Sequence, residues 1–270
     1  MALPEDISAN GAEVKGLAYL DGKIYVIHSS SKAIKVFRFT SENEFSDEGE
    51  IKNILFNTLL DIVSCKKITA LYILDLSSIW QLDTHGDVTA YVQLNHVYST
   101  ISISGRNLLV TGSRIMSKCR HRFILKPSLS RISLPEGLSN TKPLHALEID
   151  STHVISHVNS QQLHLVSKLK ETGRDRTTIE RSMYGKEAGV GDDQVNNPVY
   201  LALEPKNGHI FVADHDNSRV VVLDGNLSRR LMILNLPERC YPSRLCYVED
   251  RRKLIVGMSN GLVIGYKFTR

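Results

Sequence analysis

One stretch of the sequence, residues 197–223 (NPVYLALEPKNGHIFVADHDNSRVVVL), constrains the fold more than any other. It holds three short apolar runs, at 199–203, 210–213 and 220–223, separated by two turn signals. Asn207-Gly208 tolerates the positive φ of a tight turn, and the polar side chains of 214–218 readily hydrogen-bond their own backbone. The stretch therefore predicts three antiparallel strands. Because such a unit is marginal alone, further copies are expected.

A resemblance to a known family starts from the same residues. The segment NNPVYLAL…GHIFVADHDNSRVVVLD resembles the NHL repeat, in which a Pro-led strand is followed by a Gly, an aromatic-Val-Ala-Asp run and Asn-x-Arg. The preceding YGKEAGVGDDQVNNP resembles the Gly-rich approach loop of that family. The resemblance implies a β-propeller blade, in which Asp214, Asn217 and Arg219 shape the hairpin. It implies no ligand or activity by itself.

Five weaker copies of the unit extend the pattern along the chain. With the outer strands included, the six predicted blades span residues 15–50, 59–95, 98–135, 144–182, 197–236 and 241–268. Their spacing is close to the ~40–50 residues of propeller blades, and the period of two excludes a helical solenoid. We therefore expect an all-β, six-bladed β-propeller of four-stranded antiparallel blades, forming one domain over 1–270. A β-sandwich or barrel is the alternative, since spaced short strands are common to all three.

The end of the chain raises the question of how the ring closes. The last copy ends at 268, so its blade lacks an outer strand, and an unpaired edge needs cover. Residues 2–9 are the unassigned segment that can supply it. Pro4 suits a short edge strand. We expect this N-terminal strand to complete the sixth blade.

Composition narrows the compartment and the class of protein. The chain has 270 residues, a formal net charge of +4 and 42% hydrophobic residues, enough for a folded core. No apolar run approaches the ~20 residues that span a bilayer, and the first residues lack a secretory pattern. Its four cysteines contain no CxxC pair, which indicates free thiols in a reducing compartment. We expect a monomeric cytoplasmic domain with no cofactor and no membrane contact.

Aligning the six copies predicts which residues lie near the mouth of the central channel. These are the residues before each innermost strand: Gly16, Asp61, Thr100, His145, Tyr200 and Arg244. A propeller hydrolase or lyase with a central metal needs several converging oxygen and nitrogen ligands, and only Asp61 and His145 qualify. The sequence also contains no GxSxG nucleophile motif. The chain is therefore predicted not to be an enzyme, with a metal-dependent propeller enzyme as the least favoured alternative.

A basic segment in the third copy is the main departure from even charge. Residues 88–135 contain no acidic residue, and four basic side chains crowd the hairpin: Arg114, Lys118, Arg120 and Arg122. Such a run is usually a solvated face. If it is functional, it attracts phosphates or an acidic protein segment. Together with Tyr200, Tyr241 and Arg244, which could stack on bases or contact them, it forms the basis of an alternative function, binding of single-stranded RNA.

The leading functional prediction is a protein-binding scaffold. NHL propellers of tripartite-motif and related proteins are mostly non-enzymatic platforms that recognise proteins or single-stranded RNA, and the resemblance implies the same here. It also raises a role as the substrate-recognition part of a ubiquitin-ligase system. The sequence has no RING or B-box cluster of cysteine and histidine, so ligase activity would belong to another chain or to a missing part of a longer protein.

Overall fold

A computed structural model shows an all-β chain in which every long element is a strand. The residues it describes are 11–29, 31–40, 45–104, 107–112, 115–120, 130–131, 134, 138, 142–149, 152–157, 161–168, 178–185 and 187–268. Helical structure in this part of the chain is limited to short 3₁₀ turns such as η3 (His215–Asn217) and η4 (Glu249–Arg251). The chain divides into two compact units, residues 1–101 with 237–270 and residues 102–236.

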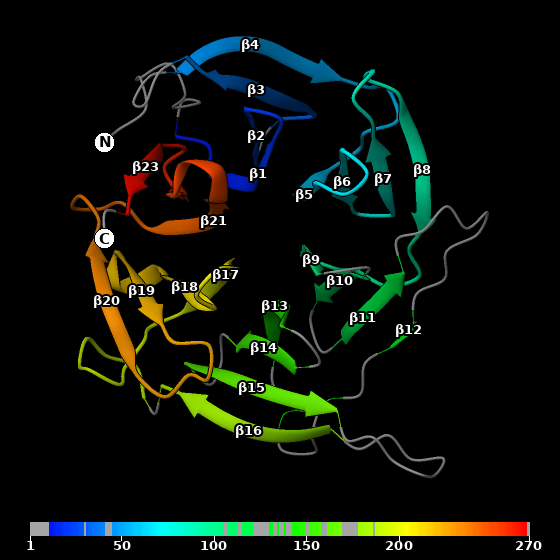
Figure 1. Ribbon diagram of the computed structural model, residues 1–270. Helices are drawn as coiled ribbons and strands as arrows, with labels where there is room; N and C mark the ends of the chain where they lie inside the picture. The colour runs from blue at the N-terminus through cyan, green and yellow to red at the C-terminus, as the bar shows by residue number, and fades with distance from the viewer. Residues whose placement is uncertain are drawn as a thin grey trace. The chain divides into compact units, whose positions relative to one another are not determined.

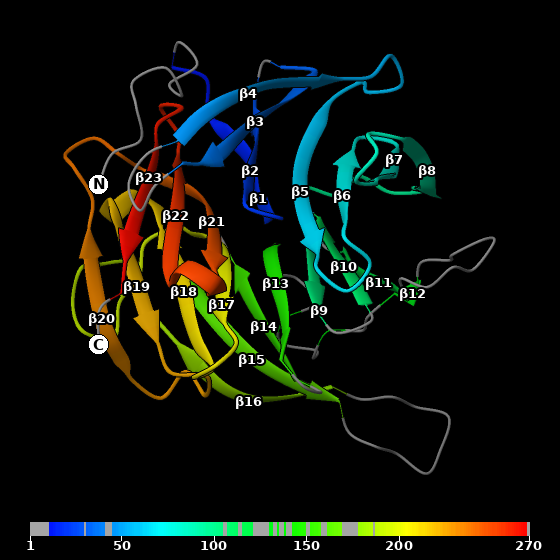
Figure 2. The ribbon, with the colours of Figure 1, turned by 45° about the horizontal axis from the view of Figure 1, so that its top comes forward.

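The first unit contains three antiparallel sheets, whose strands follow one another in sequence order (Figures 1 and 2). The first sheet consists of β1 (Val14–Leu20), β2 (Lys23–His28), β3 (Ala33–Phe39) and β4 (Phe45–Lys52). The second consists of β5 (Leu59–Cys65), β6 (Ala70–Asp75), β7 (Ser78–Leu82) and β8 (Val88–Gln93). The third has three described strands, β21 (Pro242–Val248), β22 (Lys253–Met258) and β23 (Val263–Lys267).

Three more four-stranded sheets repeat the pattern, and two of them lie wholly in the second unit. One consists of β9 (Thr100–Ser104), which begins at the junction of the units, with β10 (Asn107–Gly112), β11 (Ile115–Arg120) and β12 (Ser130–Arg131). The next consists of β13 (Pro143–Ile149), β14 (Thr152–His157), β15 (Gln162–Lys168) and β16 (Thr178–Tyr184). The last consists of β17 (Pro198–Glu204), β18 (His209–Asp214), β19 (Arg219–Leu223) and β20 (Arg230–Asn235).

These six sheets fall on the six copies predicted from the sequence. Five have the predicted four strands, including β20, which takes the outermost place expected for residues 229–236. The sixth shows three strands among the described residues. The strand predicted for residues 2–9 lies outside those residues, so closure by the N-terminal segment stays a prediction. The single domain over 1–270 also stays a prediction.

A backbone irregularity recurs at the start of the innermost strands. The register shifts at the same place in five of them, between the first and third residues of β1, β5, β13, β17 and β21. Such a bulge bends a strand and turns the following side chain to a new direction. The residue just after each bulge is the one predicted for the channel mouth. Those residues therefore lie inside their strands, whereas Thr100 is the first residue of β9.

The core of each unit forms where inner strands pack on one another. In the first unit β1 packs against β5 and β21, and in the second β13 packs against β17 and β10. The second strands are almost entirely buried, as in β6 and β22. Outer strands such as β4 and β20 are largely exposed, because they form the edges of their sheets. Because burial decreases from the inner to the outer strands, residues that can contact a partner are expected mainly in the loops and the outer strands.

Turn chemistry follows the sequence closely at the first hairpin. Asp21 and Gly22 both have positive φ, 50° and 76°, as a two-residue hairpin turn between strands of ordinary twist requires. Asp and Gly tolerate this region best, so the Asp-Gly pair sets the register of β1 and β2.

Among the described residues, no helix has the length and apolar character needed to cross a membrane.

Candidate interaction site

The predicted channel residues of the first unit, Asp61 and Arg244, form a buried ion pair. Arg244 Nε lies 3.4 Å from Asp61 Oδ1, and an Arg244 Nη donates to the carbonyl of Leu60. The two carboxylate oxygens of Asp61 also accept the backbone N–H groups of Ile62 and Ile101, at 2.9 and 3.0 Å. Asp61 is therefore surrounded by donors of this chain, which suits a structural carboxylate better than a metal ligand.

In the second unit, the predicted residues His145 and Tyr200 stack on each other. Their ring centroids lie 3.8 Å apart with 27° between the planes. The backbone N–H of Leu201 donates to His145 Nδ1 at 3.3 Å, which fixes the ring between β13 and β17. Both side chains are buried. Two of the six predicted channel residues therefore lie in contact within each unit, although no pairing between them was predicted.

Burial changes what these four residues can do. Direct contact with a partner requires exposed atoms, and Asp61, His145, Tyr200 and Arg244 are all buried. Their binding role therefore stays a prediction that burial disfavours. Within the described part of the chain, no three His, Cys, Asp or Glu side chains gather in a way that could hold a metal ion.

The other predicted binding residues lie closer to the surface or outside the described residues. Tyr241 is exposed, just before β21. Lys118 and Arg120 belong to β11, opposite Leu109 and Asn107 of β10, and nothing of their side chains is described. Arg114 and Arg122 lie outside the described residues, so the basic hairpin stays a prediction.

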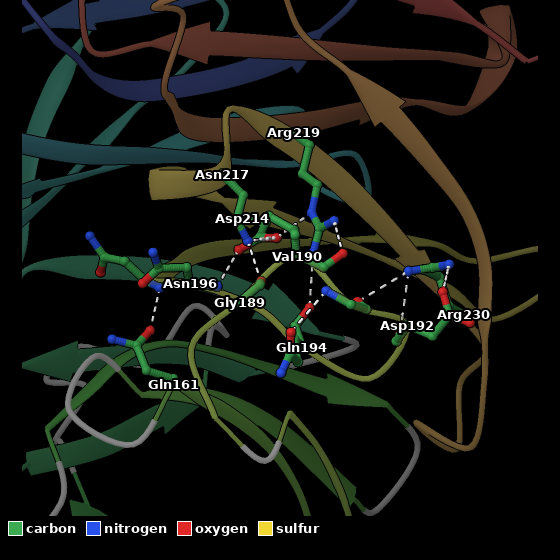
Figure 3. A network of polar contacts seen from close by, with 12 residues as sticks. Gln161, Gly189, Val190, Asp192, Gln194, Asn196, Asp214, Asn217, Arg219 and Arg230 are labelled. Atoms are coloured by element: carbon green, nitrogen blue, oxygen red, sulfur yellow. Dashed lines mark hydrogen bonds and ion pairs between the residues drawn. The ribbon is translucent and has the colours of Figure 1, made fainter.

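Asp214 is the centre of a polar network that holds the loop before β17 (Figure 3). Its Oδ2 accepts from Arg219 Nε at 2.6 Å and from Asn217 Nδ2 at 2.9 Å, while Oδ1 accepts the backbone N–H of Asn196 at 2.5 Å. Burial raises the pKa of Asp214, and these hydrogen bonds act in the opposite direction. The three donors keep a carboxylate in place where water cannot reach it.

The rest of the network reaches across the loop itself. The two terminal nitrogens of Arg219 donate to the carbonyls of Val190 and Gln194, each at 2.9 Å, and Asn217 donates to Gly189 at 2.7 Å. The resemblance implied that these side chains shape the hairpin. Their contacts extend further, because they hold the approach loop 187–197 against the sheet. We call Asp214, Asn217 and Arg219 the latch.

The second sheet contains a reduced version of this latch. Asp75 ends β6 as Asp214 ends β18, and its Oδ2 accepts the backbone N–H of Asn57 at 2.8 Å. Asn57 precedes β5 by two residues, as Asn196 precedes β17. The same carboxylate thus fixes the loop that leads into an inner strand in both sheets, and in the second sheet that loop is residues 53–58.

Loop 53–58 presents two apolar side chains to solvent from a rigid turn. Ile54 is 99% exposed and Leu55 is 50% exposed. Asn53 fixes the turn, since its side chain accepts from Leu55 N at 2.9 Å and its carbonyl from Phe56 N at 3.1 Å. Phe56 is buried in the core between the first two sheets. We call Ile54 and Leu55 the apolar tip.

A shallow hollow of about 520 Å³ adjoins the apolar tip. It is formed by the turn before β3, the end of β4 and the tip, and its lining residues are Ser31, Lys32, Ala33, Glu50, Lys52, Asn53 and Ile54. Lys52 and Glu50 pair at 2.9 Å on its rim, where both side chains are exposed. An apolar projection beside a polar hollow is a common composition for a protein-docking surface.

Comparison with known proteins identifies the fold. A scan against models of protein families finds no match, and a search of the curated proteins finds none either. Among solved structures 1208 chains match, including a chain of Kuenenia stuttgartiensis hydrazine synthase, with a TM-score of 0.61 and 13% identity over 95% of this chain and 84% of that one. This chain is a six-bladed β-propeller. At this identity the likeness concerns the fold alone.

Sequence reasoning missed the apolar tip of this propeller. Residues 53–58 lie between the first two predicted blades, 15–50 and 59–95, and no function is predicted for them from the sequence. The signal was present in the sequence as two consecutive large apolar residues, Ile54 and Leu55, directly after Asn53. Turn tips favour Gly, Asn, Asp and Pro, so an Ile-Leu pair there is an exception that calls for an explanation.

Proposed function

We propose that this propeller is a non-enzymatic scaffold that binds a protein partner through the apolar tip. The observation that carries the proposal is the exposure of Ile54 and Leu55 on a turn that is fixed from both sides. Phe56 anchors the turn in the core, and Asp75 holds Asn57. Large apolar side chains on a rigid support bind with little loss of conformational entropy, which is what an interface anchor requires.

The fold and the sequence resemblance support a finer assignment. We assign the propeller to the NHL type, because the latch formed by Asp214, Asn217 and Arg219 lies on the residues that resemble the NHL repeat. In that family such propellers act as recognition platforms, which supports a scaffold role here. Selection of substrates for a ubiquitin ligase is one use of such a platform, with ligase activity supplied by another chain.

Site-specific photocrosslinking tests the scaffold function. A photoreactive amino acid replaces Ile54 in one variant and Ile68 in a matched control. Ile68 is also an exposed isoleucine, but it follows β5 where Ile54 precedes it, so it lies at the opposite end of the same sheet. We expect one protein to crosslink from position 54 only and to bind again after purification. Equal crosslinking from both positions, or none, contradicts the proposal.

Binding of single-stranded RNA is the second candidate, favoured by the absence of acidic residues over 88–135. Fluorescence polarisation with a labelled single-stranded RNA at several salt concentrations measures it. Electrostatic binding must weaken steeply as salt increases. Absence of affinity at low salt, or affinity unchanged when Arg114, Lys118 and Arg120 are replaced by Ala, rules this function out.

A further inference from the structure

The outer strand β20 is an apolar edge with one partner strand. Within the described residues it pairs with β19 and with no other strand. Leu231 and Met232 are exposed, and Ile233 and Leu234 are half-buried, so apolar side chains are accessible on both faces of the strand. Exposed apolar edges recruit further strands unless charges, prolines or bulges prevent it, and β20 has one bulge, at Leu231 near its start.

Two other outer strands differ from β20 in what they expose. β4 has the sequence FSDEGEIK, with three acidic residues, and the exposed side chains of β8 are Thr89, Ala90 and Gln93, which are small or polar. β20 has RLMILN, in which the single charge is the arginine at its start. Its four central residues therefore lack the charges that keep an edge from pairing.

The backbone of β20 also has hydrogen-bonding groups that point away from its sheet. The N–H of Leu236, just beyond the strand, donates to the carbonyl of Ser218 at 3.1 Å. Because N–H and C=O groups alternate in direction along a strand, those of Ile233 and Asn235 point away from β19. They form the row that an added antiparallel strand would use.

We propose that the β20 edges of two copies of this chain pair antiparallel about a two-fold axis at Ile233. The outward N–H and C=O groups of Ile233 then bond those of Ile233 in the second copy. The register of β20 shifts at Leu231, so the regular part of the strand is residues 232–235. A two-fold pairing requires that a surface complement itself. The proposal goes beyond partner binding at the apolar tip and departs from the monomer expected from the sequence.

The charges at the two ends of β20 favour a second copy of this chain as the source of the added strand. Arg229, which is exposed, precedes β20, and Glu238, also exposed, follows it by three residues. Antiparallel pairing at Ile233 places Arg229 opposite Pro237 of the second copy, next to its Glu238. Each dimer therefore brings Arg229 of one copy near Glu238 of the other copy twice, with exposed Arg239 next to Glu238. The area buried by a strand pair is much smaller than the ~1,200 Å² of a stable interface. We therefore expect a dissociation constant above ~1 µM.

Sedimentation of the purified full chain from about 1 to 300 µM tests the pairing. Met232→Lys places a charge on the edge, and Met183→Lys is the matched control, since both methionines are 43% exposed and lie on outer strands. Wild type and Met183→Lys should dimerise at high concentration, and Met232→Lys should remain monomeric. In the dimer, the amides of Ile233 and Asn235 should be protected from hydrogen exchange. A wild-type chain that is monomeric throughout, or a dimer indifferent to Met232→Lys, overturns the proposal.

A charge exchange tests the register. Arg229→Glu or Glu238→Lys alone should weaken the dimer at least several-fold at low salt, and the double variant should restore it. These side chains are exposed, so the variants should fold like the wild type, which circular dichroism checks. A double variant as weak as the two single ones contradicts pairing at Ile233.

Discussion

Arg244 and Asp61 form a buried ion pair between two strands, β21 and β5, that both pack against β1. Their charged atoms lie 3.4 Å apart, and Gly16 occupies the equivalent position of β1, where it contributes no side chain. Three copies of one repeat thus carry three different residues at the same place. Asp61 and Arg244 neutralise each other's charge, and Gly16 adds no side chain beside them.

The first prediction concerns the stability that depends on this pair. Arg244→Met leaves Asp61 charged and buried without its cation, which should lower the free energy of unfolding by about 3–5 kcal/mol. Urea denaturation measures it. Lys66→Ala removes an exposed ion pair with Glu249 and should cost less than about 1 kcal/mol. Similar losses in both variants would contradict a structural role for the buried pair.

Gly16 provides the second prediction, because a Cβ at this position has little space. It would lie 3.0 Å from Ile27 Cδ1 and 3.1 Å from the backbone nitrogen of Ile62. Since the backbone of β5 must shift to accept it, Gly16→Ala should lower stability by about 1–3 kcal/mol. Gly265→Ala is the control, with a nearest contact of 3.4 Å to Ile255 Cδ1. Thermal unfolding that ranks Gly265→Ala as equally harmful would refute this explanation.

The third prediction concerns acid sensitivity at His157, which is buried with its ring 4.9 Å from that of His164. Burial, with the nearby His164, lowers the pKa of His157 from 6.5 to about 3. The folded chain therefore binds fewer protons than the unfolded chain between these values. The stability that neutral His157 maintains is present above pH 6.5 and lost as the pH falls toward 3.

Replacement of this histidine should reduce the slope of stability against pH. In His157→Phe, the fall in unfolding free energy between pH 7 and 5 should be smaller than in wild type by up to about 1.4 kcal/mol per pH unit. Denaturant titrations at several pH values provide the comparison, with exposed His85→Gln as the control. An identical pH profile for wild type and His157→Phe would show that another group causes the sensitivity.

The fourth prediction tests the latch on loop 187–197. Arg219→Ala removes two bonds to loop carbonyls and the cation beside buried Asp214, so hydrogen exchange of the loop amides should accelerate and stability should fall by about 2–4 kcal/mol. Arg230→Ala removes a surface contact with Asp192 on the same loop and should cost less than about 1 kcal/mol. Unchanged exchange in Arg219→Ala would contradict the latch.

Particular residues show how far the sequence could predict this structure. Alternation and turn residues located all six sheets, and alignment of the copies placed Asp61 and Arg244 at equivalent positions of different copies. Local patterns repeat from blade to blade, which makes such inferences possible. The bond from Arg244 to Asp61 was not predictable, because it depends on which side chains meet across β1.

Exposure was the property that the sequence predicted least well. The channel positions were expected to be accessible, yet His145 and Tyr200 cover each other. The exposure of the apolar tip was not predicted either, because Ile54 and Leu55 are residue types that are usually buried in a core. Burial depends on the tertiary neighbours of a residue and not on its own chemistry, so the structure had to supply it.

The binding role of the apolar tip is the central claim, and one measurement addresses it directly. The partner captured at position 54 is purified, and its affinity for wild type, Ile54→Asp and Ile68→Asp is measured by calorimetry. Loss of an apolar anchor from an interface costs about 2 kcal/mol or more. We therefore expect Ile54→Asp to weaken binding at least ~30-fold, with Ile68→Asp equal to wild type. Equal affinity for all three chains would contradict the claim.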